Sequence, residues 1–127
     1  FALKKAIGSI AVGKRMGCIG HAINNVVKNS RFKSILDYGG HGIGLTKEGK
    51  GRPHIFPFIP NKSILQEGLR FQNGMTFAIE PMLVMGMSNE TKIAEDGWTV
   101  LTKDIGCHAE HTVSIWDNKI EVITARM

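Results

Sequence analysis

Three side chains that can bind a divalent metal ion stand in glycine-rich or apolar surroundings. His41 lies between Gly40 and Gly42, Glu80 ends one apolar run, and Glu110 precedes another. A carboxylate beside an apolar run is costly to bury without a partner, because it loses its hydration. Imidazole nitrogen and carboxylate oxygen are both ligands that zinc and related ions accept. The sequence therefore predicts that these three side chains converge on a shared metal ion in the folded chain.

Each of the three residues also has a simpler interpretation. A histidine in a glycine turn can be purely structural, and Glu80 can reach water at the end of its strand. Glu110 can lie on the exposed polar face of an antiparallel sheet. Period-two alternation would place His108, Glu110 and Thr112 on one face of their strand, and either face could line a site. Only the combination of the three candidates favours the metal site.

The apolar pattern predicts the helices and strands that hold these side chains in place. Apolar residues recur at intervals of three and four along residues 15–29, which predicts an amphipathic helix, and residues 2–7 resemble the end of another helix. Runs rich in β-branched and apolar residues predict strands at 32–38, 75–85, 98–102, 110–116 and 119–124. Asp117-Asn118 would join the last two strands in a hairpin.

Two further candidates lie in less regular segments. Residues 45–61 contain three prolines, which cannot sit inside a central strand, so we expect a long surface loop there. His54 lies in this segment and is either a substrate contact, as loop residues often are, or a solvated side chain. Trp98 follows Asp96-Gly97 and is either the wall of a pocket or part of the core.

Composition limits the class of protein. With 127 residues and 43% hydrophobic residues, the chain is expected to form one modest domain. No stretch approaches the ~18 apolar residues of a membrane-spanning helix, and no secretory signal is apparent. Cys18 and Cys107 are too few for a disulfide framework, so we expect free thiols in the cytoplasm. The net charge of +5 is spread without aromatic interleaving, so neither a membrane nor a specific nucleic acid is an expected partner.

Five short motifs occur in a fixed order between residues 39 and 124. They are Gly40-His41-Gly42-Ile43-Gly44, His54-x-x-Pro57, Gly74-Met75-Thr76-Phe77-Ala78-Ile79-Glu80-Pro81-Met82, Asp96-Gly97-Trp98-Thr99-Val100 and Glu110-His111-Thr112-Val113. Taken together, they resemble the C-terminal half of type I methionine aminopeptidases. The resemblance implies an α/β (α+β) chain with the pita-bread fold, in which two pseudo-symmetric halves curve a mainly antiparallel sheet around a dinuclear metal centre, with helices outside.

The resemblance also implies roles for individual residues. His41 and Glu80 would bind one metal ion, Glu110 would bind both ions, His54 would contact the substrate near the scissile carbonyl, and Trp98 would wall the methionine pocket. Two divalent ions (Co, Mn, Fe or Zn) would activate water and polarise the carbonyl, while a glutamate moves the proton. The catalytic set would be His54, Glu80 and Glu110. The implied activity is that of a metallo-exopeptidase, a methionyl aminopeptidase that removes the initiator methionine from peptides and nascent proteins.

The chain departs from the family pattern in several places. The family's two aspartate ligands and another substrate-contacting histidine belong to its N-terminal half, so we expect residues 1–127 to be the C-terminal portion of the catalytic domain. This portion alone would hold one ion, would need the N-terminal portion as a partner for activity, and would otherwise self-associate through exposed strand edges. Pro53 replaces an aromatic residue, and residues 45–52 resemble an insertion. His108 stands where the family commonly has glutamine, and could add a ligand or a hydrogen-bond donor.

Two other functions are compatible with the same motifs. One is a catalytically inactive pita-bread module that only binds partners, and the retention of His41, Glu80 and Glu110 argues against it. The other is a related metallopeptidase of different specificity, such as one that cuts before proline. Residues 96–100 fit the methionine enzymes better.

Overall fold

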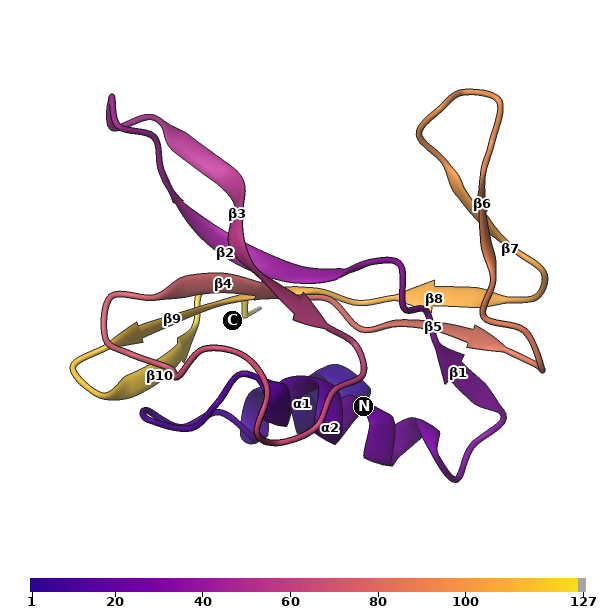
Figure 1. Ribbon diagram of the computed structural model, residues 1–127, viewed down its shortest axis with the longest axis horizontal. Coiled ribbons are helices and arrows are strands. Elements are labelled where there is room, and N and C mark those ends of the chain that lie inside the picture. The colour runs from indigo at the N-terminus through magenta and orange to yellow at the C-terminus, as the bar shows by residue number, and fades with distance from the viewer. Residues whose placement is uncertain (126–127) are drawn as a thin grey trace.

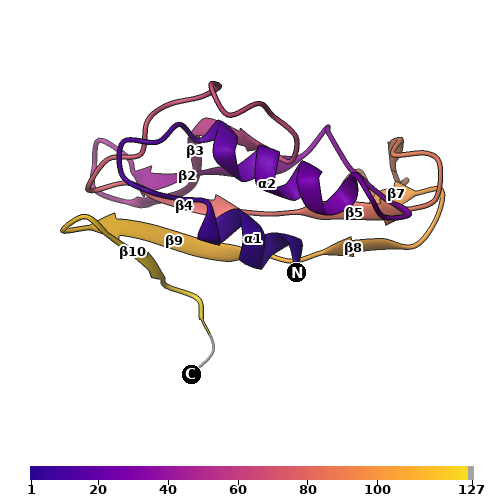
Figure 2. The same ribbon diagram turned by 90° about the horizontal axis from the view of Figure 1, so that it is seen from below.

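The computed structural model describes residues 1–125 as an α+β chain, in which two helices cover one face of a layer of antiparallel strands (Figures 1 and 2). The helices are α1 (Ala2–Gly8) and α2 (Gly17–Val27). The strands are β1 (Phe32–Ser34), β2 (Gly39–Leu45), β3 (Gly51–Pro60), β4 (Thr76–Ile79), β5 (Met82–Met85), β6 (Thr91–Ile93), β7 (Val100–Thr102), β8 (Gly106–His108), β9 (His111–Trp116) and β10 (Lys119–Val122).

The strands of the described residues form three sheets. One has the order β10-β9-β4-β2-β3, the second has the order β1-β5-β8, and β6 pairs with β7 alone. Because β5 continues the path of β4 and β9 continues that of β8, one long antiparallel ribbon runs through both larger sheets (Figure 1). β4 is the middle strand of the five-stranded sheet, so its end is surrounded by other strands.

The core lies between the helices and the central strands. Ile19 and Ile23 of α2 pack with Phe77 of β4 and Ile115 of β9, and all four side chains are almost completely buried. The ring of Phe77 stacks on that of Phe71 with a centroid distance of 5.4 Å. The predicted helix at 15–29 is therefore confirmed over Gly17–Val27, and its apolar stripe is the face that enters the core.

The expected surface loop at 45–61 is wrong for most of its length, because residues 51–60 form β3. β3 is an edge strand of its sheet, where a proline does not remove a hydrogen bond to a second neighbour. The register also shifts between His41, which faces Phe58, and Gly42, which faces Ile55. This irregularity leaves Phe56 and Pro57 without partners in the ladder.

Two other expectations concern the strands that carry the acidic candidates. The run at 75–85 is not one strand, because it is interrupted between Ile79 and Met82. The terminal hairpin is confirmed: β9 pairs with β10, and Asp117 and Asn118 have φ values of 48° and 58°. Both values belong to the left-handed region that a tight two-residue hairpin turn requires.

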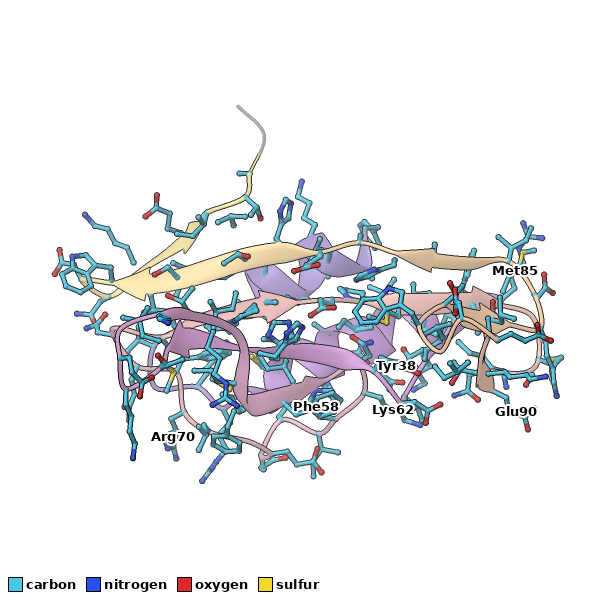
Figure 3. The ribbon with its side chains drawn as sticks, turned by 90° about the horizontal axis from the view of Figure 1, so that it is seen from above. Tyr38, Phe58, Lys62, Arg70, Met85 and Glu90 are labelled. Carbon is cyan, nitrogen blue, oxygen red and sulfur yellow. The ribbon has the colours of Figure 1, made fainter. Side chains whose placement is uncertain are left out.

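The face of the strand layer away from the helices carries two projecting hairpins. The β2–β3 hairpin and the β6–β7 hairpin both rise from this face in Figure 1, and Figure 3 looks onto it with the helices behind the strands.

Among the described residues, no helix is both long and apolar enough to cross a membrane. Both cysteines are free thiols, Cys18 buried and Cys107 exposed, as predicted.

Candidate metal centre

Strand register brings the two acidic candidates together. Ile79 pairs with His111 and Met82 pairs with His108, so the same register across the interruption sets Glu80 opposite Glu110. Phe77 and Ile79 point into the core beneath the helices, and alternation therefore turns Glu80 toward the opposite face. Two carboxylates directly opposite each other repel when both are ionised. A bound cation, or protonation of one of the two carboxyl groups, relieves this repulsion.

His41 approaches Glu80 from the other neighbouring strand. Gly42 pairs with Phe77 in the β2–β4 ladder, and continuing this register places His41 opposite Ala78, one diagonal step from Glu80. The Nε2 atom of His41 lies 3.0 Å from Oε1 of Glu80. Only 16% of the His41 side chain and 11% of the Glu80 side chain are exposed, so this contact is largely shielded from water.

The hydrogen bonding of the His41 ring indicates that no proton lies between Nε2 of His41 and Oε1 of Glu80, so that each atom presents a lone pair to the other. Nδ1 of His41 lies 3.0 Å from the carbonyl oxygen of Gly42, which can only accept a hydrogen bond. In the neutral ring, the proton is then on Nδ1, and Nε2 carries a lone pair. Consistent with this, Oε1 of Glu80 is buried without a hydrogen-bond partner among the described residues, although Nε2 is close enough to be one. A cation between the two atoms would satisfy both.

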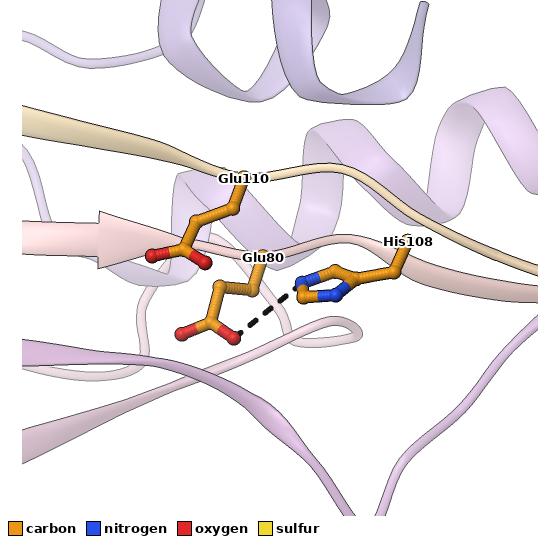
Figure 4. A group of neighbouring side chains, drawn as sticks. All are labelled: Glu80, His108 and Glu110. Carbon is orange, nitrogen blue, oxygen red and sulfur yellow. Dashed lines mark ion pairs between the residues drawn. The ribbon is translucent and has the colours of Figure 1, made fainter. Parts of the chain in front are cut away.

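His108 lies on the other side of Glu80. Its Nε2 atom is 3.5 Å from Oε2 of Glu80. One ligand atom from each of Glu80, His108 and Glu110 lies within 4.8 Å of the others, which is close enough for one ion to contact all three. Figure 4 shows the carboxylates of Glu80 and Glu110 pointing to the same side of their strands, with the His108 ring directed at Glu80. Alternation along the strand was the sequence signal for His108, and its proximity to Glu80 was not apparent from it.

The two remaining candidates differ in position. His54 of β3 lies beside His41, with ring centroids 4.1 Å apart. Trp98 lies between β6 and β7 and is 87% exposed, so it is not part of the core. Its predicted role as a pocket wall stays a prediction.

The surroundings of Glu80 alter its acidity. Burial raises the pKa of the Glu80 carboxyl, and the negative charge of Glu110 raises this pKa further. The nearby imidazoles of His41, His108 and His54 act in the opposite direction and lower the pKa. Because the net pKa shift is upward, the ionised carboxylate is costly in the metal-free chain.

The donor set fits a divalent metal ion. An unpartnered buried carboxylate oxygen, an imidazole with its lone pair facing that oxygen, and a second carboxylate are the groups that Mn, Fe, Co and Zn accept. The Nδ1 contact of His41 with the Gly42 carbonyl also holds the ring in the orientation that presents Nε2, as the outer hydrogen bond of a metal-bound histidine does.

A small residue before His41 allows β2 to approach β4. A Cβ atom on Gly40 would overlap the carbonyl oxygen of Ala78. We therefore expect Gly40→Ala to push the strands apart, to destabilise the chain by about 1 to 3 kcal/mol, and to weaken metal binding. Gly51→Ala is the matched control, because a Cβ there meets nothing within 4 Å. Chemical denaturation and metal titration of both variants test this, and equal values for the two variants would contradict it.

Comparison with known proteins identifies the family to which the chain is similar. The family model described as metallopeptidase family M24 matches residues 1–117. The chain is 45% identical over 125 residues to a methionine aminopeptidase from Mycoplasma capricolum. The matched segment covers 97% of this chain and 47% of that protein. It is also 45% identical over 118 residues to a methionine aminopeptidase from Aquifex aeolicus, covering 90% of this chain and 43% of that protein. The chain thus spans about half the length of the curated relatives it matches.

A solved structure gives the same result for the fold. The crystal structure of a methionine aminopeptidase from Thermotoga maritima superposes with a TM-score of 0.85 at 38% identity, covering 98% of this chain and 48% of that chain. The predicted resemblance to methionine aminopeptidases and the predicted pita-bread fold class are therefore confirmed.

Proposed function

Because the chain belongs to metallopeptidase family M24, we propose that it is the C-terminal portion of a metal-dependent methionyl aminopeptidase. The substrate would be a peptide or nascent protein that begins with methionine, and the reaction would take place in the cytoplasm. The observation that carries this proposal is the buried Oε1 atom of Glu80, which has no hydrogen-bond partner among the described residues and faces Nε2 of His41. The similarity to methionine aminopeptidases supports the choice of substrate.

We assign the metal ligands to His41, Glu80 and Glu110. A divalent ion bound there would polarise the scissile carbonyl and lower the pKa of a water molecule. A second ion would need ligands beyond these three, so we assign its remaining ligands to an N-terminal portion that pairs with this chain. Imidazole and carboxylate ligands accommodate Co, Mn, Fe and Zn, and the choice among these ions is a matter for direct metal analysis.

The chain's own residues would then orient the substrate and move the proton. His54, beside His41, would contact the substrate near the scissile carbonyl, and Trp98 would wall the methionine pocket. Glu110 is exposed, unlike Glu80, so its carboxylate can reach both the attacking water and the leaving amine. We assign to Glu110 the transfer of a proton from one to the other.

Methionine release from a peptide that begins Met-Ala tests the proposal. The chain is assayed with Mn, Co or Fe(II), with and without an N-terminal portion taken from a methionine aminopeptidase. We expect release only when both portions and the metal are present. No release under any of these conditions would reject the proposed activity and would favour an inactive interaction module.

Glu110→Gln tests the role of the acidic pair in the same assay. We expect it to lower methionine release at least ~100-fold, because amide oxygen is a weak ligand and the amide cannot carry the proton. Glu121→Gln is the matched control, since Glu121 is an exposed glutamate on the neighbouring strand β10, and it should leave the rate unchanged. Full activity of Glu110→Gln would remove Glu110 from the site.

A further inference from the structure

We propose that His108 is a further metal ligand, so that this chain by itself holds one divalent ion through two imidazoles and two carboxylates. The ligands would be His41, Glu80, His108 and Glu110. This inference rests on the proposed metal-dependent function and deepens it, because it assigns a complete four-ligand set to residues of one chain.

The contacts around Glu80 carry the first step of the argument. Its two carboxylate oxygens face two different imidazoles: Oε1 lies 3.0 Å from Nε2 of His41, and Oε2 lies 3.5 Å from Nε2 of His108. Glu110 approaches from the opposing strand and lies within 4.8 Å of both Glu80 and His108, measured between ligand atoms. His41 is not part of that group of three and faces the other carboxylate oxygen of Glu80. An ion bound by all four residues would therefore be held by both oxygens of Glu80, with one imidazole on the side of each oxygen.

The contact between His108 and Glu80 is looser than a hydrogen bond that holds a side chain in place. An N–H···O bond in a protein is typically ~2.7 to 3.2 Å long, whereas this distance is 3.5 Å. The His108 side chain is 46% exposed, which leaves its ring room to turn. The imidazole is thus free to direct Nε2 at an ion held between the two carboxylates.

His108, the last residue of β8, and Glu110, which precedes β9, lie on the same extended segment. Their spacing of two residues places both side chains on the face that carries Glu80, while Val113 and Ile115 turn into the core. Two carboxylates also balance the two positive charges of the ion. Four ligands of mixed nitrogen and oxygen type are enough to hold one zinc ion without a ligand from another chain. Zinc can expand to five-coordinate, so a position for the water of the proposed reaction would be kept.

Zinc titration of the full 127-residue chain by calorimetry tests the proposal. We expect one zinc ion per chain, and we expect His108→Gln to weaken binding at least ~10-fold, because the amide cannot replace the imidazole nitrogen. His111→Gln is the matched control. It lies one residue beyond Glu110, and its Nδ1 atom is 2.9 Å from Oγ1 of Thr124, so it should bind zinc like the parent chain.

X-ray absorption of the zinc-loaded parent chain gives a second readout that does not depend on the folding of a variant. We expect two imidazoles per zinc ion in the parent chain and one in His108→Gln. An unchanged zinc affinity of His108→Gln, or the same number of imidazoles per zinc ion in His108→Gln as in the parent chain, would overturn the role of His108 and leave the proposed function standing. Failure of the parent chain to bind zinc, manganese or cobalt would overturn this inference, whereas the proposed function is decided separately by methionine release in the presence of the N-terminal portion.

Discussion

Replacing Glu80 by glutamine should abolish metal binding and, at the same time, make the metal-free chain more stable at neutral pH. Glu80 is the centre of the site, with His41 on one side, His108 on the other and Glu110 opposite. Removing its negative charge takes away the proposed ligand that lies next to all the other donors, so we expect at least ~100-fold weaker metal binding and a comparable loss of methionine release.

The stability gain follows from the pKa of Glu80. Burial and the neighbouring Glu110 raise this pKa in the folded chain. The folded chain therefore keeps the proton at pH values where the unfolded chain has already lost it. By linkage, the free energy of unfolding falls as the pH rises from the unfolded pKa through the raised folded pKa. Glu80→Gln removes this loss and should make the metal-free chain more stable than the parent chain at pH 7.

Denaturation of the metal-free chain at several pH values between 4 and 8 measures this effect, and metal titration measures the loss of binding. As the pH rises across this range, the free energy of unfolding of the parent chain should fall more than that of Glu80→Gln. At the acidic end of the range, the two chains should be equally stable. Glu95→Gln, which changes an exposed glutamate, is the control and should follow the parent chain. A Glu80→Gln chain that is less stable than the parent at pH 7, or that binds metal normally, would contradict the assigned environment.

Phe77→Ala should have the largest effect on stability. Phe77 is 1% exposed, stacks on Phe71 and lies in the core under α2, three residues before Glu80. Truncating a buried phenylalanine removes its apolar contacts and leaves a cavity, which typically costs ~3 to 5 kcal/mol. Since whole domains are stable by only ~5 to 15 kcal/mol, this single change should remove a large part of the folding free energy.

Urea denaturation followed by circular dichroism measures this loss. Phe56→Ala is the matched control, because Phe56 is 78% exposed on the edge strand β3, and its truncation should change the stability by less than ~0.5 kcal/mol. Metal binding by Phe77→Ala should weaken in proportion to the unfolded fraction. If Phe77→Ala is as stable as Phe56→Ala, the proposed packing of β4 against α2 is incorrect.

Much of the local structure is determined by patterns within short segments. The apolar stripe of residues 15–29 predicts α2, and the two β-branched runs around Asp117-Asn118 predict the β9–β10 hairpin. Such patterns need no information from distant residues, because the period of a helix or strand decides which side chains share a face. The same local alternation places Glu110 and His108 on one face, and the ordered motifs around His41, Glu80 and Glu110 identify the family.

Other features depend on which strands become neighbours, and the amino-acid sequence alone does not state this. The prolines of residues 51–60 are compatible with β3 only because that strand lies at the edge of the sheet. The register across the interruption in the central ribbon decides that Glu80 faces Glu110 and that His108 reaches Glu80. Residue types thus determined the chemistry available to this chain. The pairing of segments far apart in sequence decided which donors meet, because register is set by the packing of the whole sheet.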